Sequence, residues 1–503
     1  MGDRSEPTGP ALTTDAQWDV LYIDGEWRPA DGDETIPVMD PSTRDQVARV
    51  PAGTEGDVDA AYEAAAEAAT EWAETTPDRR ETVLNEFLQA FDDNKEAIIE
   101  LLEDEAGGSR IMGETSIGIA RDHAREASTY PRRVKGEHKE SSIPGKENIV
   151  RREPAGVVTV ITPWNFPLNL TMRAVAPAVA TGNTVVIKPA TNTPITGGLV
   201  FARLFEETSL PDGVVNVVTG RGSEIGDRVA GHPESDVVTF TGSTPVGRQV
   251  AATAAENLAT PVMELGGNNA HIVTADADLD AAVDGGVFGS FVHQGQVCIS
   301  INRHVVHEDV YDEYVDRLTQ RAEALPVGSA HDPDTVVGPI IDESQRDEML
   351  GYVEETVDAG ATLETGGETV DLPGVEDSLV VAPTVLSEVT NDMSAACFEH
   401  FGPIAPVIPF STVEEAIDIA NDTAYGLSGS VHAGDEGTGQ SIARRLDTGH
   451  VHVDDQPIND EAHVPFSGIN ASGMGGFNSD RILDAITETK WISVQHEPRE
   501  FPF

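Results

Sequence analysis

The stretch VVTVITPWNFPLNLTMRAVAPAVATGNTVVIKP, residues 157–189, determines the fold class of this chain. Short runs of β-branched residues at 157–161 and 184–187 enclose an apolar segment with helical spacing at 168–181. Two strands joined by one helix and short loops pair in parallel. The same alternation continues with strands expected at 214–218 and 237–240 and helices at 195–208, 223–231 and 245–257. These repeats predict a doubly wound α/β domain.

A second α/β series follows the first. Its expected elements are a helix at 276–291, a strand at 303–307, helices at 309–324 and 342–359, a strand at 404–410 and a helix at 412–421. Upstream, 58–73 and about 79–106 are predicted as long helices rich in alanine and acids, and roughly the first 17 residues as a loose polar tail. The segments 132–153 and 490–503 fit neither series and are predicted as extended strands, available to pair with a neighbouring chain.

The composition is strongly acidic. The chain has 87 acidic and 32 basic side chains, a formal net charge of −55, which excludes a general electrostatic surface for nucleic acid or for an anionic membrane. Salt shortens the Debye length to about 3 Å at 1 M, so this charge suits a protein of a halophile, with an ordinary acidic protein as the alternative. The free energy of unfolding should then rise with salt, and full stability at low ionic strength would contradict the halophile hypothesis.

Cysteine content and hydropathy indicate the compartment. Two cysteines, Cys298 and Cys397, cannot form a disulfide framework, which favours a reducing environment. The N-terminal MGDRSEPTGP contains no apolar segment, and no stretch reaches about 18 apolar residues. These features predict a cytoplasmic protein without a membrane partner.

Acidic residues are unevenly distributed. They make up 87 of 503 residues, yet the segment 154–205 contains none, and shorter acid-free windows occur at 237–255, 285–307 and 462–479. Burial of a strand in the core would by itself explain the absence of acidic residues from any one of these windows. The polar and glycine-rich runs PWNFP, FTGSTPVG, HQGQVC and FSGINASGMGG inside these windows favour a functional site instead.

Three residues in acid-poor surroundings have types that support catalysis. Cys298 is either an inert buried thiol or a nucleophile. Asn165, just after the strand at 157–161, is either a structural turn residue or a donor to a developing oxyanion. Glu264 is an isolated acid in an apolar, glycine-rich segment, so desolvation disfavours its charged form; it is either structural or a general base.

The segment VVTFTGSTPVGRQVAA, residues 237–252, predicts a strand, a turn and the start of a helix. Ser243 or Thr244 can cap this helix, and its free N–H groups suit a pyrophosphate. The usual G-x-G-x-x-G spacing is absent, because Gly220, Gly222 and Gly226 have one residue too many.

Taken in order, Asn165, Lys188, GSTPVG (242–247), ELGG (264–267), GQVC (295–298) and EHFGP (399–403) resemble the aldehyde dehydrogenase superfamily. The resemblance runs from YIDGEW (22–27) to the C-terminal tail. It implies an NAD(P)-binding domain at 18–131 and 154–263, a catalytic domain at 264–461 and a small β flap for oligomerisation at 132–153 and 484–503. A homodimer or homotetramer is the expected assembly.

The resemblance also implies roles for single residues. Cys298 would attack the aldehyde carbon, Asn165 and the Cys298 backbone N–H would hold the oxyanion, and Glu264 would activate the water that hydrolyses the thioester. The implied cofactor contacts are Lys188, Thr191, Gly222, Gly242, Ser243, Glu399, Phe401 and Trp164. No metal is implied.

The sequence departs from the family pattern at three positions. Thr191 stands where NAD-preferring members carry a glutamate that binds the 2′-hydroxyl of the adenosine ribose, so the cofactor is NAD or NADP. His293 replaces the usual asparagine before QGQ, and Asn268 the usual lysine after ELGG; the sequence assigns neither a role.

The segment FPLNLTMRAVAPA, with Arg173 where many relatives carry an aromatic residue, resembles the benzaldehyde and vanillin dehydrogenase branch. An aromatic aldehyde is therefore the expected substrate, and the candidate pocket residues are Arg173, Leu170, Phe166, Phe291 and Phe466. The alternatives are a semialdehyde acid whose distal carboxylate pairs with Arg173, or a broad range of aliphatic aldehydes. Two further classes, a non-redox cysteine hydrolase using Cys298 and His293 and a non-catalytic binding protein, are kept as rivals.

Overall fold

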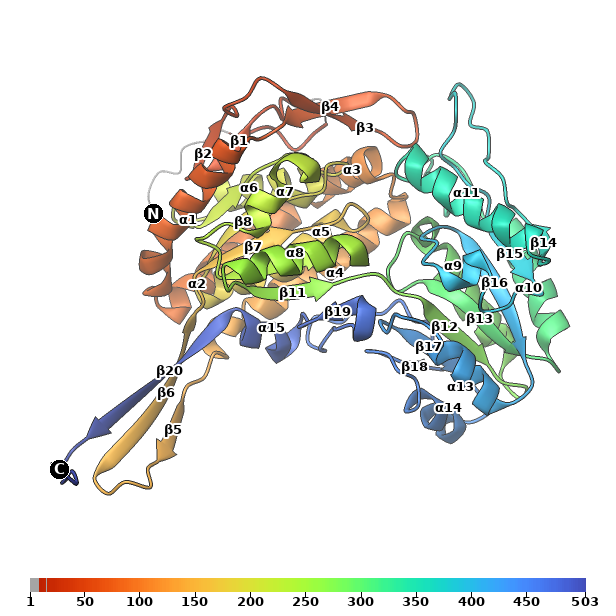
Figure 1. Ribbon diagram of the computed structural model, residues 1–503. Coiled ribbons are helices and arrows are strands. Elements are labelled where there is room, and N and C mark those ends of the chain that lie inside the picture. Colours follow the sequence, from red (N-terminus) through yellow and green to blue (C-terminus); the bar gives the residue numbers. More distant parts are fainter. Residues whose placement is uncertain (1–8, 15) are drawn as a thin grey trace.

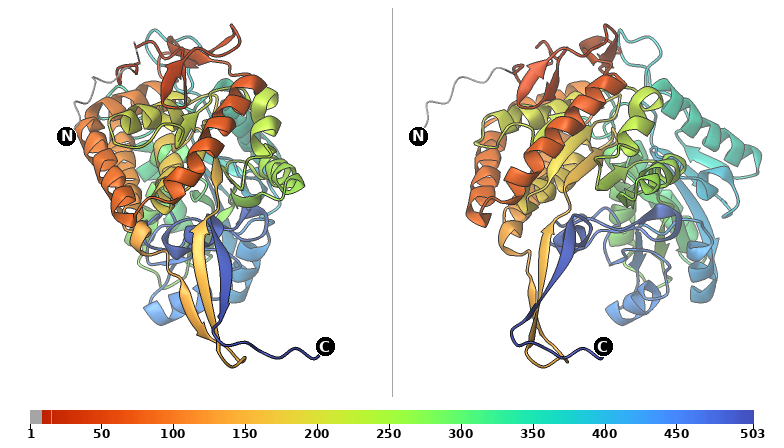
Figure 2. Two further views of the ribbon diagram at one scale, coloured as in Figure 1. Left: turned by 90° about the vertical axis from the view of Figure 1, so that its left-hand side faces the viewer. Right: turned by 60° about the vertical axis from the view of Figure 1, so that its left-hand side comes forward.

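The computed structural model describes residues 9–14 and 16–503. The chain forms two α/β units, each built on a largely parallel sheet, and a three-stranded antiparallel flap projects from the first unit (Figures 1 and 2). The predicted α/β fold class is confirmed. Of the helices that the structure describes, none is both long and apolar enough to cross a membrane.

The first sheet is centred on five parallel strands, β7 to β11. Its strand order is β19-β11-β10-β7-β8-β9-β1-β2, so the chain moves from β7 to β9 and then returns to place β10 on the other side of β7. Ligands of such sheets bind outside the carboxyl ends of the strands near this reversal. The strands are β1 (Leu21–Ile23), β2 (Glu26–Arg28), β7 (Val157–Ile161), β8 (Thr184–Lys188), β9 (Val215–Val217), β10 (Val237–Thr241), β11 (Thr260–Glu264) and β19 (Gly473–Met474).

Helices cover both faces of this sheet. Burial of valines on both faces explains why the strands are continuous apolar runs rather than alternating ones. One face is packed by α1 (Glu55–Ala73), α7 (Gly222–Ala230) and α8 (Thr244–Glu256). The other is packed by α2 (Pro77–Asp93), α3 (Lys95–Ala106), α4 (Arg110–Ala127), α5 (Pro167–Thr181), the π-helix η2 (Ile195–Leu199), α6 (Val200–Glu206) and α15 (Ser479–Ala485).

Two upstream predictions were wrong. The helix expected over 79–106 is interrupted at Asn94, whose side-chain amide donates to the Ala90 carbonyl at 2.8 Å and so ends α2. The described part of the expected loose tail is packed: Leu12 is buried, and the Thr14 hydroxyl donates to Asp104 at 2.6 Å. Residues 1–8 and 15 lie outside the described residues.

The second sheet has the order β14-β15-β16-β13-β12-β17-β18 and is parallel except at the β14–β15 pair. Its strands are β12 (Asn269–Val273), β13 (Ile301–His307), β14 (Thr362–Thr365), β15 (Thr384–Ser387), β16 (Ile404–Phe410), β17 (Gly429–His432) and β18 (His452–Val453). Its helices are α9 (Leu279–Phe291), the 3-10 turn η3 (Val292–Gly295), α10 (Tyr311–Glu323), α11 (Glu343–Asp358), α12 (Ser394–Cys397), α13 (Val413–Asn421) and α14 (Glu436–Ala443). Asp278, Asp342 and Asp435 cap α9, α11 and α14 through their side chains.

The two segments predicted as extended form the flap. β5 (Glu137–Glu140) and β20 (Thr487–Gln495) flank β6 (Lys146–Pro154), and the three strands leave the body together (Figure 2). Trp491 is 68% exposed on β20. A separate hairpin of β3 (Thr35–Met39) and β4 (Gln46–Pro51) lies beside the first sheet (Figure 1).

Candidate active site

The predicted site residues converge where the two sheets face each other. Asn165 follows β7 and Glu264 ends β11, so both lie at the carboxyl edge of the first sheet. Cys298 and Glu399 come before β13 and β16, at the amino edge of the second. A cavity of about 470 Å³ is lined by residues from both edges, among them Trp164, Asn165, Leu170, Gly242, Ser243, Cys298, Glu399 and Phe401.

A tight turn presents Cys298 to this cavity. After α9, three consecutive residues, His293, Gln294 and Gly295, adopt left-handed φ angles of 49°, 56° and 71°. A Cβ atom on Gly295 would lie 2.1 Å from the Gly402 carbonyl oxygen, so only glycine fits there. The turn leaves the Cys298 side chain partly exposed among buried neighbours.

Asn269 fixes the backbone of the cysteine and was missed by the sequence analysis. Its side-chain amide donates to the carbonyl oxygens of Cys298 at 2.9 Å and Ser300 at 2.7 Å. A Cβ atom on Gly267 would lie 2.4 Å from the same Cys298 oxygen, which explains the second glycine of ELGG. The sequence feature that could have revealed it is an asparagine at the start of β12, two residues after Gly267.

Asn165 is tied to the cysteine loop by two hydrogen bonds. Its side-chain amide donates to the Gln296 carbonyl at 2.8 Å, which leaves its second N–H hydrogen for a ligand. His293 Nε2 bonds to the Asn165 backbone carbonyl at 2.7 Å, and burial lowers the pKa of His293 to about 4. His293 is therefore a neutral donor that positions Asn165, and its Nε2 is not free to act as the base of a cysteine hydrolase.

Burial sets the protonation of the three acidic groups near the cavity. It raises the pKa of Glu264 to about 8, against the opposing charge of Arg173. It raises the pKa of the Cys298 thiol to about 12, again opposed by Arg173, and that of Glu399 to about 7. Glu264 is 3% exposed. It directly precedes Leu265 and Gly266 in the sequence, and those two residues line the cavity.

The glycine pair also lets Glu399 lie close to the chain just after β11. The Gly267 amide donates to Glu399 Oε1 at 3.0 Å, and a Cβ atom on Gly266 would lie 2.1 Å from Glu399 Oε2. Beside them, the Phe401 and Trp164 rings meet edge to face, with centroids 5.4 Å apart.

Ser243 is the N-cap residue of α8 and lines the cavity. Its hydroxyl makes no capping bond within the described chain, and the Thr244 hydroxyl instead donates to the Ala471 carbonyl at 2.9 Å. Neither side chain thus caps the helix as predicted, and the first-turn amides of α8 stay available to an anion.

A second cavity, of about 410 Å³, contains Thr191. Arg44 and Arg221 also line it, together with the acids Asp342 and Glu343. Lys188, at the end of β8, is 5% exposed, and burial lowers its pKa to about 8. Gly222 is the exposed first residue of α7.

Four predicted pocket residues are absent from the lining of the main cavity. Phe291 is 1% exposed in the core cluster of the second sheet with Val283 and Tyr314, so the structure corrects its assignment to the pocket. Phe166 and Phe466 instead share a small apolar cluster with Cys298. Arg173 is 2% exposed and is also absent from the cavity wall.

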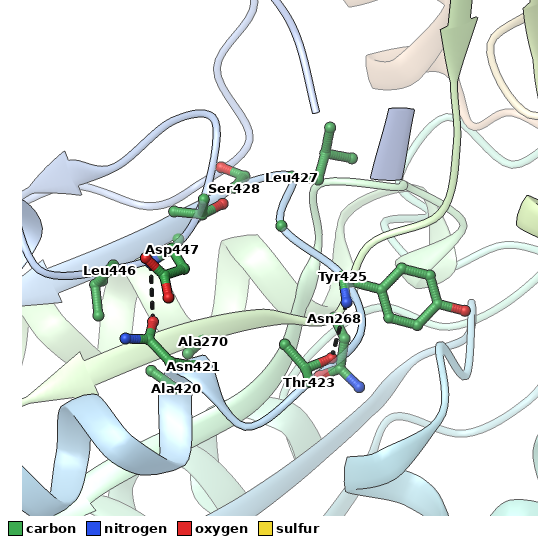
Figure 3. Close-up of a pocket in the computed structure, with 13 residues that line it drawn as sticks. Asn268, Ala270, Ala420, Asn421, Thr423, Tyr425, Leu427, Ser428, Leu446 and Asp447 are labelled. Atoms are coloured by element: carbon green, nitrogen blue, oxygen red, sulfur yellow. Dashed lines mark hydrogen bonds between the residues drawn. The ribbon is translucent and has the colours of Figure 1, made fainter. Parts of the chain in front are cut away.

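Asn268 has a structural role. Its side chain donates to the carbonyls of Ala396 at 2.8 Å and Cys397 at 3.1 Å, just before Glu399, while Arg303 donates to its backbone carbonyl at 2.8 Å. The hollow beside it measures only about 20 Å³ (Figure 3). There the Tyr425 ring points away from Asn421 and Asp447 (Figure 3). Tyr425 also lines the main cavity.

The sequence profile of the Aldehyde dehydrogenase family matches residues 27–492. The chain belongs to the aldehyde dehydrogenase family. The resemblance inferred from the motifs is thereby confirmed, and the protein is an oxidoreductase of that family. Within the described part of this aldehyde dehydrogenase, no group of three histidine, cysteine or acidic side chains is placed to hold a metal ion.

Similar proteins agree with this assignment over nearly the full length. A benzaldehyde dehydrogenase of Bacillus subtilis is 42% identical over 96% of this chain and 98% of its own length. A vanillin dehydrogenase of Corynebacterium glutamicum is 40% identical over 94% and 97%. The solved structure of a betaine aldehyde dehydrogenase from Staphylococcus aureus in complex with NAD+ has a TM-score of 0.93, 33% identity and 96% coverage of both chains.

Proposed function

We propose that this aldehyde dehydrogenase oxidises an aromatic aldehyde to the carboxylic acid with NAD or NADP as cofactor. The observation that carries the proposal is that Cys298 and Asn165 line one cavity. The Asn165 side chain is held there by its hydrogen bond to the Gln296 carbonyl in the cysteine loop. The benzaldehyde and vanillin dehydrogenases among its relatives support an aromatic substrate. The apolar cluster of Phe166, Phe466 and Cys298 supports the same class.

The chain's own residues account for the covalent chemistry. The Cys298 thiolate attacks the aldehyde carbon, and the free N–H of Asn165 together with the Cys298 amide stabilises the negative oxygen of the tetrahedral adduct. When bound, the nicotinamide supplies the hydride acceptor. Glu264 then takes a proton from the water that attacks the resulting thioester, releasing the acid and the Cys298 thiol.

The structure has features that fit a dinucleotide in the main cavity. The first turn of α8 offers amides to a pyrophosphate, and no acid occurs between residues 237 and 255. Glu399 can accept from ribose hydroxyls, and the paired rings of Trp164 and Phe401 offer an apolar surface to the nicotinamide.

The substrate proposal is tested by absorbance at 340 nm at high salt, with benzaldehyde and with succinate semialdehyde. We expect faster turnover of benzaldehyde at equal concentration. A strong preference for the semialdehyde acid that is lost in Arg173→Ala would overturn the aromatic assignment, and no signal with either aldehyde from folded protein would overturn the dehydrogenase proposal.

Cofactor choice is expected to depend on Thr191. Its hydroxyl does not repel a 2′-phosphate, and Arg44 and Arg221 line the same cavity. Thr191→Glu should weaken NADP binding by about tenfold or more, because a carboxylate opposes the phosphate charge. Fluorescence titration with NAD and NADP measures this, with the neutral Thr191→Gln as the matched control. Equal NADP affinity in the two variants would contradict the prediction.

The same fold supports a proposal for domain roles and assembly. We assign cofactor binding to 18–131 and 154–263, catalysis to 264–461 and assembly to 132–153 and 484–503. β19 pairs with β11 and α15 packs on the first core, which supports grouping 462–483 with the first domain.

The exposed Trp491 on a projecting strand supports a homodimer or homotetramer built through the flap. Free Cys298 and Cys397 support a cytoplasmic location.

A further inference from the structure

Arg173 is a buried cation on α5, and no carboxylate of the described residues bonds to it directly. It is 2% exposed, and its guanidinium stacks on the rings of Phe466 and Phe477, with centroid distances of 4.9 and 4.6 Å. Nη2 donates to the Thr241 hydroxyl at 3.3 Å, while Nε lacks an acceptor among the described residues. A buried guanidinium needs compensating negative charge nearby.

Arg173 contacts residues of the strands that flank Glu264 or of the segments next to them. Thr241 ends β10 and is the register partner of Glu264 on β11. On the other side of β11, Glu264 pairs with Gly473 of β19. Phe466 precedes β19 in the sequence and Phe477 follows it, and these two residues pair with each other. The guanidinium is therefore fixed in the wall that encloses the Glu264 carboxyl group.

Neither carboxylate oxygen of Glu264 accepts a hydrogen bond of normal geometry from the described residues. The positive charge of Arg173 is the largest influence that favours its ionised form, and it also favours ionisation of the Cys298 thiol. Arg481 acts in the same direction on Glu264, more weakly.

The other charged groups around this wall are accounted for. Asp460 opposes ionisation of both Glu264 and Cys298, and Glu399 and Glu264 itself oppose that of Cys298. Asp460 already bonds to His123 at 3.2 Å and to Asn478 at 2.7 Å. Burial lowers the pKa of His450, which also faces Arg173, to about 4, so His450 is uncharged.

We propose that Arg173 is a positioning residue whose buried positive charge stabilises the ionised forms of Glu264 and Cys298, and that it does not bind a carboxylate of the substrate. Arg173 is 2% exposed and does not line the main cavity, so a substrate carboxylate bound in that cavity would not contact the guanidinium. The proposal rests on the proposed function for the role of Glu264, whereas its effect on the thiol is independent of turnover.

The experiment measures alkylation of Cys298 by iodoacetamide against pH, in a Cys397→Ser background so that only Cys298 reacts. Arg173→Gln should slow alkylation at neutral pH by about tenfold and move the profile to higher pH, because one opposing charge is lost. Arg173→Lys retains the charge and should restore the profile. Arg173→Met retains packing between the rings and should behave like Arg173→Gln, which separates charge from folding.

The exposed Arg481→Gln is the matched control and should move the profile much less. Identical profiles for the wild type and both neutral variants would overturn the proposal. A raised KM for succinate semialdehyde with an unmoved profile would instead make Arg173 a substrate ligand. If no aldehyde is oxidised by the wild type, the proposed function fails, and the alkylation profiles still decide the role of Arg173.

Discussion

Replacement of Cys298 by serine should reduce aldehyde oxidation by at least about 10³-fold while cofactor affinity stays within about twofold. The thiol is the group that the turn at 293–295 and the Asn269 bonds present to the cavity. Serine keeps the size of the side chain but offers an alkoxide that is far harder to form. The proposed cofactor contacts come from other residues of the cavity, among them Ser243 and Glu399, so binding should survive.

Two measurements separate chemistry from binding. Steady-state turnover at 340 nm reports oxidation, and fluorescence titration reports the affinity for NAD and NADP. Cys397→Ser is the matched control, because Cys397 is the other free cysteine and is exposed at the end of α12. Near-normal turnover in Cys298→Ser would remove Cys298 from the mechanism, and equal losses in both variants would indicate a general effect of thiol removal.

Strand ends were the part of the site that the sequence could predict. Asn165, Lys188, Ser243 and Glu264 each follow or end a β-branched run, and carboxyl ends of parallel strands share one edge of a sheet. Their approach to one another therefore follows from the local pattern once parallel pairing is assumed. Placing Cys298 opposite them needed the family resemblance, because it lies at the amino edge of a different sheet.

Close contacts between segments distant in the sequence could not be predicted. Gly266, Gly267 and Gly295 are required by close approaches to Glu399, Cys298 and Gly402, and each approach joins segments far apart in the chain. Asn269 orients the site through two hydrogen bonds and His293 through one, and no periodicity reveals these bonds. Phe291 was misplaced because an apolar residue near a catalytic loop has the same sequence signature in a core as in a pocket.

The long acid-free segment has a simpler explanation than a binding site. Every residue of α5 is buried, as are those of β8, so most of the window 154–205 lacks acids because it lacks surface. Within it, Trp164 and Asn165 lie in the turn after β7 and Lys188 and Thr191 at or just after the end of β8, whereas Leu170 and Arg173 lie on α5. The isolated acids were the better guide, because Glu264 and Glu399 are acids retained where burial opposes their charge.

Glu264→Gln is expected to preserve the first oxidation and to block the release of acid. Glutamine cannot take a proton from water, so the thioester on Cys298 should accumulate after one equivalent of reduced cofactor has formed. Steady-state turnover should fall by about 10² to 10⁴, the usual contribution of a general base. Stopped-flow absorbance at 340 nm would then show a burst followed by a slow phase. Loss of the burst as well would mean that Glu264 activates the thiol rather than water.

The pH dependence distinguishes this role from a structural one. Burial raises the pKa of Glu264 to about 8, and only the ionised carboxylate accepts a proton. The rate of thioester hydrolysis should therefore rise about tenfold per pH unit below pH 8 and level off above it. The rising part is the acid limb of the pH profile, and the residual rate of Glu264→Gln should lack this limb. Glu348 lines the main cavity, and Glu348→Gln is the matched control that should keep both the burst and the limb. A limb retained in Glu264→Gln would assign the base to another group, with Glu399 the next candidate because burial raises its pKa to about 7.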